Sequence, residues 1–133
     1  MKVKLIFIDP EKKEAKTIAC ENNKIEDFAH EHVAKTLDSL VCYIGDLKTK
    51  FYVYCDDNWT NDYFVSASTP NGDPFLYGKL LVCKLDSTGV ISLTDEDIDY
   101  IKRYLATEFV WINENEFKIE NTILIKNVTQ TTI

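Results

Sequence analysis

The sequence predicts one α+β domain over residues 1–133, with a mixed or antiparallel sheet of about six strands and two helices packed on it. Three observations support this prediction. The length of 133 residues suits one domain with its own core. Short segments rich in β-branched and aromatic residues recur along the chain, separated by turn-forming residues. Two other segments carry apolar side chains at helical spacing.

The first half of the chain predicts a hairpin, a helix and two more strands. Residues 2–8 alternate apolar and polar side chains until an Asp-Pro pair ends the strand, and residues 14–20 follow as its hairpin partner. Apolar side chains at helical spacing predict a helix over residues 25–38. Residues 40–45 and 50–55 are predicted strands, the second of them rich in aromatic and β-branched residues.

Three strands are predicted in the next part of the chain. Residues 63–68 form a short strand before residues 69–74, where Pro, Asn and Gly indicate turns. Residues 76–85 are the most apolar segment and are predicted to form a central strand. A turn at Gly89 leads from it into a short strand over residues 90–92.

A second helix is predicted to begin after Thr94, which is a favourable N-cap residue. Four acidic side chains follow it closely, where they interact well with the positive end of the helix dipole. Its predicted buried stripe consists of Ile98, Ile101, Tyr104 and Leu105. The rest of the chain is predicted as a hairpin, with strands over residues 117–119 and 122–125 around Glu120 and Asn121, and as a frayed tail over residues 128–133.

Cysteine spacing and hydropathy predict a soluble, cytoplasmic protein. Cys20, Cys42, Cys55 and Cys83 include no C-x-x-C pair, so the spacing typical of zinc sites is absent. Each lies in an apolar, strand-like context, which favours reduced thiols in the core over disulfides. No apolar run approaches the roughly 20 residues of a membrane span, and the N-terminal residues lack the apolar core of a secretory signal.

The negative charge is concentrated in the middle of the chain. The net charge is −7, and residues 51–117 carry twelve acidic against four basic side chains. Residues 1–50 are balanced, with nine of each kind. Arg103 is the only arginine among fifteen basic residues, whereas nucleic-acid recognition depends on arginine forks and basic stripes. Direct binding of nucleic acid by this chain is therefore not expected.

The sequence patterns predict no catalytic residue, metal or cofactor, so a non-enzymatic protein is expected. An EF-hand loop starting at Asp56 needs Gly at its sixth position and Glu at its twelfth, and the chain has neither. His30 and His32 lie about 200° apart on the predicted helix and cannot share a metal. Ser66 and Ser68 lack the G-x-S-x-G context of a nucleophile, and no Gly-rich phosphate loop is present.

Two acidic segments form the predicted partner-binding surface. One is the loop DDNWTND, whose Trp and the Tyr after it either fold back onto the core or anchor a partner. The other is the acidic helix start, where capping explains the position of the acids but not the charge of the whole middle section. Clustered carboxylates can resemble a phosphate backbone and be steered towards a basic cleft. The predicted residues are Asp56, Asp57, Trp59, Asp62, Tyr63, Asp95, Glu96, Asp97 and Asp99.

The order of these segments resembles that of a family of small proteins of unknown function from bacteriophages and mobile elements. In that family an acidic or Asn-Gly turn precedes an Asn, a Tyr-x-x-x-Gly strand and a Ser-Leu-Thr-Asp-Glu helix start. The resemblance covers residues 1–10 and 50–105, and the chain departs from it after residue 106 and at the segment WTNDY. The residues that fit are Asn71, Gly78, Ser92, Leu93, Thr94, Asp95 and Glu96.

This resemblance implies an accessory protein that opposes a host defence. With the acidic segments, it leads us to expect an inhibitor of a nuclease-based defence, of anti-CRISPR or anti-restriction type, in the cytoplasm of the host bacterium. Its expected partner is a defence protein with a basic nucleic-acid cleft. The alternative is a sponge for a small signalling nucleotide, with Tyr52, Tyr54 or Trp59 stacking on the base and Lys50 or Lys79 holding the phosphates.

Two further classes stay open from the sequence. A hydrolase acting on such a nucleotide would need turnover and a metal. A small assembly subunit or homodimer could instead pair through an exposed edge of the hairpin over residues 117–125.

Overall fold

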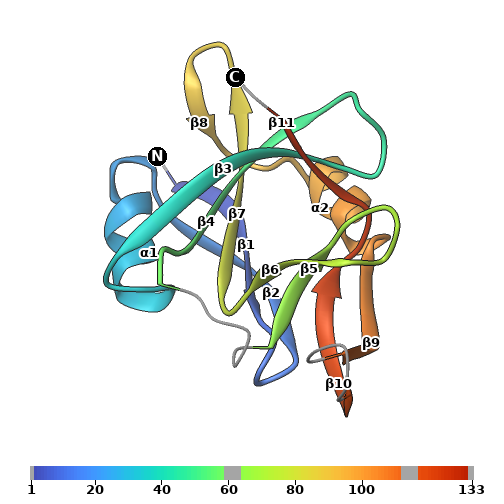
Figure 1. Ribbon diagram of the computed structural model, residues 1–133. Coiled ribbons are helices and arrows are strands. Elements are labelled where there is room, and N and C mark those ends of the chain that lie inside the picture. Colours follow the sequence, from blue (N-terminus) through green and yellow to red (C-terminus); the bar gives the residue numbers. More distant parts are fainter. Residues whose placement is uncertain (1, 59–63, 112–116, 132–133) are drawn as a thin grey trace.

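The computed structural model describes residues 2–58, 64–111 and 117–131 and confirms the predicted α+β class (Figure 1). A seven-stranded main sheet and a four-stranded second sheet are accompanied, in this described part, by two α-helices and a short 3-10 helix, Asn22–Lys24. The main sheet holds about the number of strands that the sequence predicts. The division of the strands into two sheets was not predicted.

The main sheet is antiparallel at every pair of neighbouring strands. β7 (Leu80–Asp86) lies between β4 and β1, in the central position predicted for the most apolar segment. Across the sheet the order is β11 (Val128–Thr131), β3 (Leu37–Ile44), β4 (Lys50–Asp56), β7, β1 (Lys2–Asp9) and β2 (Glu14–Glu21), and β8 (Gly89–Ile91) also pairs with β7.

The second sheet is mixed and takes its strands from the second half of the chain. β5 and β10 are parallel, with Ala67 opposite Ile125, and the two other pairs are antiparallel. Its order is β6 (Pro74–Tyr77), β5 (Val65–Ser68), β10 (Phe117–Ile125) and β9 (Leu105–Trp111).

Both faces of the main sheet are covered (Figure 1). α1 (Ile25–His32) packs on one face, in a core cluster that includes Leu81 of β7. α2 (Asp95–Lys102) and the second sheet pack on the other face. The core cluster there contains Ala67 of the second sheet and Val82 of β7. Consecutive residues of β7 therefore point into different cores, which explains why this strand is continuously apolar and does not alternate.

The first helix is shorter than predicted. It ends at His32, and Leu37, which was predicted to be helical, begins β3 opposite Asp56 of β4. Leu37 still packs against the core on the α1 face, so its burial is satisfied in the strand. Pairing with a strand far along the chain overrides the local helical spacing.

The second helix begins after Thr94 as predicted and buries Ile98 and Ile101. It ends at Lys102, however, so Tyr104 and Leu105 do not continue its stripe. Leu105 is the first residue of β9 and pairs with Ile125. Tyr104 therefore lies in the turn after the helix, and Leu105 lies in the strand that follows.

The predicted central strand over residues 76–85 is two strands that belong to different sheets. Gly78 separates them with a φ of +83°, a left-handed conformation that favours glycine. Its N–H donates to the carbonyl of Phe64 at 2.8 Å, which fixes the crossing point. β6 precedes Gly78 in the second sheet, and β7 follows it in the main sheet.

The C-terminal predictions were wrong in two respects. Residues 117–125 form one strand, and the register shift between Lys118 and Asn121 falls where a hairpin turn was predicted. The predicted frayed tail contains β11, which pairs with β3 from Val128 to Thr131. Val128 is 3 % exposed and belongs to the main core, so burial holds this segment in the sheet.

The four cysteines are unpaired, as predicted. Cys42, Cys55 and Cys83 are buried, whereas Cys20 on β2 is half-buried. Burial raises the pKa of each of the three buried thiols to about 12. They therefore behave as small apolar side chains at neutral pH.

Candidate functional site

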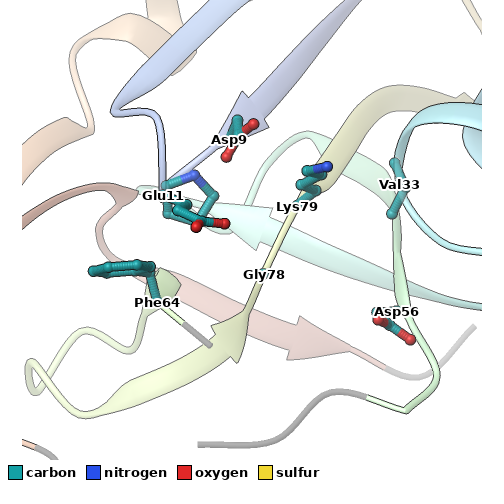
Figure 2. A pocket seen from close by; sticks show the side chains of 8 residues that line it. Asp9, Glu11, Val33, Asp56, Phe64, Gly78 and Lys79 are labelled. Atoms are coloured by element: carbon teal, nitrogen blue, oxygen red, sulfur yellow. The ribbon is translucent and has the colours of Figure 1, made fainter. Parts of the chain in front are cut away.

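A pocket of about 460 Å³ lies at one end of the main sheet, where β1 and β4 end and β7 begins. We call it the acidic pocket. Figure 2 shows its side chains around the opening, with Phe64 on one side and Asp56 on the other. Its lining consists of Asp9, Pro10, Glu11, Val33, Asp56, Phe64, Gly78 and Lys79.

Strand topology brings these residues together. β1 and β4 flank β7 and are both antiparallel to it, so their C-terminal ends lie at the same end of the sheet. Ile8 pairs with Leu80, and Tyr54 pairs with Leu81, so continuing the register by one residue from Ile8 and by two from Tyr54 places both Asp9 and Asp56 beside Lys79. Two apolar strands that each end in Asp thus deliver a carboxylate to one pocket.

Asp9 is the most buried acid of the pocket, with 3 % of its surface exposed. Its Oδ1 accepts a hydrogen bond from the backbone N–H of Lys12 at 3.2 Å, within the turn after β1. Lys13 closes that turn at a φ of 58° and donates its N–H to the carbonyl of Pro10. The turn therefore holds the Asp9 carboxylate in place, and its second oxygen has no bonded partner among the described residues.

Among the described lining residues, Lys79 is the single basic side chain, and three carboxylates share the pocket with it. In the described part of the chain, no salt bridge joins Lys79 to Asp9, Glu11 or Asp56. The carboxylates therefore keep their capacity to accept charge-assisted hydrogen bonds from a ligand or partner.

Two more acids enlarge the negative surface around this end of the sheet. Asp38 lies opposite Cys55 on the neighbouring strand, and Asp57 follows β4 directly. Asp38 is paired with Cys55, and Asp56 and Asp57 follow Cys55 in the chain, so burial first and then these three charges raise the pKa of the Cys55 thiol. We call the set Asp9, Glu11, Asp38, Asp56 and Asp57 the acidic end.

The predicted acids of α2 have local partners. Lys4 donates to the Asp95 carboxylate at 2.6 Å, and its hydrogen bond and charge hold the pKa of Asp95 below the ordinary value. Asp97 accepts from Lys84 at 3.0 Å and from the Thr94 N–H at 2.8 Å, completing a capping box.

The pKa of Asp97 reflects two opposing causes. Burial raises it, but the bonds from the Thr94 backbone and the Lys84 ammonium outweigh burial and leave the pKa below the ordinary value. Glu96 and Asp99 are exposed on the same helix. The α2 acids thus include two that fix the helix against the main sheet and two that face solvent.

The two acidic segments do not form one surface. Asp97 bonds to Lys84, whereas Asp56 lies beside Lys79 in the acidic pocket. Lys79 directly precedes β7 and Lys84 lies on it five residues later, which is about 17 Å along a strand. The structure therefore places Asp56 and Asp57 at one end of the main sheet and Asp95, Glu96, Asp97 and Asp99 towards the other end.

Three of the predicted partner-binding residues, Trp59, Asp62 and Tyr63, lie outside the described residues. Sequence reasoning overlooked Asp9, Glu11 and Asp38, which complete the acidic end. A signal for Asp9 was present, because both its strand and the FYVYC strand end in Asp. Recognising it required the knowledge that the two strands flank a common neighbour.

Two of the aromatic residues considered for stacking on a nucleotide, Tyr52 and Tyr54, are used in packing, and the third, Trp59, lies outside the described residues. Tyr54 is 8 % exposed, and its ring contacts that of Tyr52 at 5.3 Å between centroids. The Tyr52 hydroxyl lies 2.6 Å from Ser39 Oγ. Lys79, which was considered for phosphate binding, lies among carboxylates. Of Tyr52, Tyr54 and Lys79, Lys79 alone is among the described lining residues of the acidic pocket.

Other candidate residues are also accounted for. His30 Nδ1 lies 2.9 Å from the Lys35 carbonyl, and His32 packs on Phe28 with 4.2 Å between ring centroids. The hydroxyls of Ser66 and Ser68 are buried and have no hydrogen-bond partner among the described residues. Within that same part of the chain, no three His, Cys, Asp or Glu side chains are grouped so that they could hold a metal.

The proposed pairing edge over residues 117–125 is interior to the second sheet. β10 pairs with β9 from Phe117 to Ile125 and with β5 at Ile125, so these residues are one strand between two neighbours and not a separate hairpin. None of the described helices has the length and apolar character of a membrane span.

Comparisons with protein-family models, curated proteins and solved structures gave no match to this chain.

Proposed function

We propose that this protein is a non-enzymatic accessory protein of a phage or mobile element that inhibits a nuclease-based host defence. It acts by binding, with the acidic end placed in a basic cleft that otherwise holds nucleic acid. The observation that carries the proposal is the acidic end itself, where three carboxylates line one pocket and two more, Asp38 and Asp57, lie near Cys55 on the adjoining strands. Such clustering causes electrostatic self-repulsion in the fold, which a basic partner would relieve.

The chemistry of the acidic pocket supports a cationic partner group. Its lining carries three carboxylates against one ammonium, so a guanidinium or ammonium entering it finds several acceptors. Phe64 and Val33 supply apolar surface for the stem of such a side chain. The same charge disfavours a phosphate in this pocket, so the nucleotide sponge finds no support at this site.

The contact surface in the proposal is smaller than the sequence suggested. Asp56 and Asp57 belong to it, together with Asp9, Glu11 and Asp38. Trp59 and Tyr63 stay in the proposal as anchors, on the basis of sequence alone. The acids of α2 are assigned to the stability of the helix and to general solvation.

Purified defence nucleases provide the test. DNA cleavage by a guide-loaded CRISPR nuclease and by a type I restriction complex is measured with increasing amounts of the wild-type protein. We expect inhibition of at least one, weakening as salt rises because exposed charges are screened. The variant Asp56→Asn with Asp57→Asn should need at least a tenfold higher concentration, equivalent to about 1.4 kcal/mol.

The matched control is Glu96→Gln with Asp99→Asn, which removes two negative charges from the other acidic segment. It should inhibit within about twofold of the wild type. Equal losses in both double variants would show that net charge acts and not the acidic end. Undiminished cleavage by every nuclease with the wild-type protein would refute the proposed function.

A further inference from the structure

A second hollow, of about 550 Å³, lies where three chain connections meet. They are the turn between β5 and β6, the end of α2, and the link between β10 and β11 (Figure 1). We call it the basic hollow. Its lining consists of Thr69, Pro70, Asn71, Gly72, Arg103, Tyr104, Lys126 and Asn127.

The charge of the basic hollow is opposite to that of the chain. The protein carries a net charge of −7, yet the described lining holds Arg103 and Lys126 and no carboxylate. Arg103 is the only arginine of the chain. Its side chain has no hydrogen-bond or salt-bridge partner among the described residues, so the guanidinium remains available to a ligand.

Backbone hydrogen bonds fix the three connections that carry these side chains. The Lys126 N–H donates to the Tyr104 carbonyl at 2.8 Å, which joins the end of α2 to the end of β10. The Gly72 N–H donates to the Thr69 carbonyl at 2.9 Å and closes the turn on the other side. Asn127 adopts a left-handed φ of 60°, and its carbonyl accepts from the Gly45 N–H.

The remaining lining residues add donors and an aromatic ring. The side-chain amides of Asn71 and Asn127 can donate hydrogen bonds to an anion. Tyr104 is half-buried, and its ring is held against Tyr100 with 5.3 Å between centroids. A fixed, partly exposed ring beside two cations can stack on a flat, electron-poor group.

We propose that the basic hollow binds the phosphate group of a small ligand, of the nucleoside diphosphate class. Arg103 grips two phosphate oxygens with its planar fork, and Lys126 adds a second positive charge. Asn71 and Asn127 donate to the remaining oxygens, and Tyr104 provides the surface for the base. The volume lies within the range of small-molecule sites, about 300–1,000 Å³.

This inference does not depend on the proposed function. The basic hollow lies next to the Ile44 end of β3. Its lining residue Asn127 accepts a hydrogen bond from Gly45, the residue that follows this strand. The acidic pocket lies at the Leu37 end of the same strand, where Leu37 pairs with Asp56. Either site can therefore fail its test without affecting the other.

Titration calorimetry in low salt tests the inference with ADP, inorganic phosphate and adenosine as separate probes. We expect ADP and phosphate to bind the wild-type protein, ADP more tightly, and adenosine not to bind. Arg103→Gln should weaken the binding of ADP at least tenfold, because a bidentate charged contact is lost. Its melting temperature should stay that of the wild type, because the guanidinium has no partner among the described residues.

Lys102→Gln is the matched control, since Lys102 is an exposed neighbour of Arg103 outside the lining. It removes the same charge and should change the ADP dissociation constant less than twofold. The inference is overturned if neither ADP nor phosphate binds at millimolar concentration. It is overturned as well if adenosine binds as tightly as ADP, or if Arg103→Gln binds ADP as the wild type does.

Discussion

Gly45 has less space around it than Gly72 or Gly89. It follows β3 with a φ of +75°, and a Cβ built on it would overlap the side chains of Tyr104 and Tyr100. The Tyr100 hydroxyl donates to the Ile44 carbonyl at 2.7 Å and accepts from the Asp46 N–H at 2.9 Å. Because Gly45 has no side chain, the Tyr100 hydroxyl can reach the backbone at the end of β3 and bond α2 to the main sheet.

Gly45→Ala should lower the free energy of unfolding by about 2–4 kcal/mol. About 1–2 kcal/mol comes from the left-handed backbone conformation, and the rest from displacement of the two tyrosines. Urea unfolding followed by circular dichroism measures the change. Gly72→Ala is the control, because Gly72 also has a positive φ, +88°, but has no atom within 4 Å of a built Cβ. Equal losses in both variants would disprove the steric part of this account.

At the scale of elements, α2 depends on one carboxylate in its first turn. Asp97 accepts from the Thr94 backbone and from Lys84, and its side chain is only 13 % exposed. It therefore caps the helix and also ties it to the central strand β7. The other acids of the turn do not have this double role.

Asp97→Ala should destabilise the protein by about 1–2 kcal/mol at pH 7, through the lost cap and the unpaired Lys84. The folded-state pKa of Asp97 is lowered, so its contribution is complete above the ordinary pKa of about 3.9 and is lost as the pH falls through the folded-state value. Urea unfolding at pH 7 and pH 3 should show the difference from wild type shrinking at the lower pH.

Asp99→Ala is the control for this prediction, since Asp99 is exposed on the same helix. It should change stability by no more than about 0.5 kcal/mol. A difference between Asp97→Ala and wild type that stayed constant from pH 7 to pH 3 would contradict the electrostatic explanation.

At the scale of the whole molecule, one core joins the two sheets. The cluster on the α2 face contains Ile8 and Val82 of the main sheet, Ala67 and Ile125 of the second sheet, and Ile101 of α2. Because neither sheet buries this face without the other, we expect them to unfold together. Cooperative unfolding of both sheets is the behaviour that we expect of the predicted single domain.

Calorimetry should therefore show one transition whose calorimetric and van't Hoff enthalpies agree. For a chain of this length the enthalpy should be about 90 kcal/mol near 60 °C. Ile125→Ala removes a side chain that is 1 % exposed in the second sheet and should move the whole transition, at a cost of about 2–5 kcal/mol. Two separated transitions in this variant would show that the sheets unfold independently.

Features with local causes were predictable from the sequence. The N-cap at Thr94 and the buried positions Ile98 and Ile101 follow from residues within two helical turns. The turn after β1 and the apolar character of β7 are likewise visible in short windows. Hydrogen bonding and burial patterns repeat over these short distances, so the residues alone indicate them.

Several of the mistaken predictions concern pairing between distant segments. Leu37 was assigned to a helix although it pairs with Asp56, and Val128 was assigned to a tail although it pairs with Ile44. The crossing at Gly78 from one sheet to the other is of the same kind. Which strands become neighbours depends on contacts far apart in the chain, which local spacing does not encode.

The sequence by itself determined the α+β class, the main elements, the free cysteines and an acidic middle section. Only the tertiary structure decided where that charge lies. It separates the α2 acids from Asp56 and brings Asp9 to the same pocket, because β1 and β4 both lie against β7. It also places Arg103 beside Lys126, residues from two connections that meet only through sheet pairing.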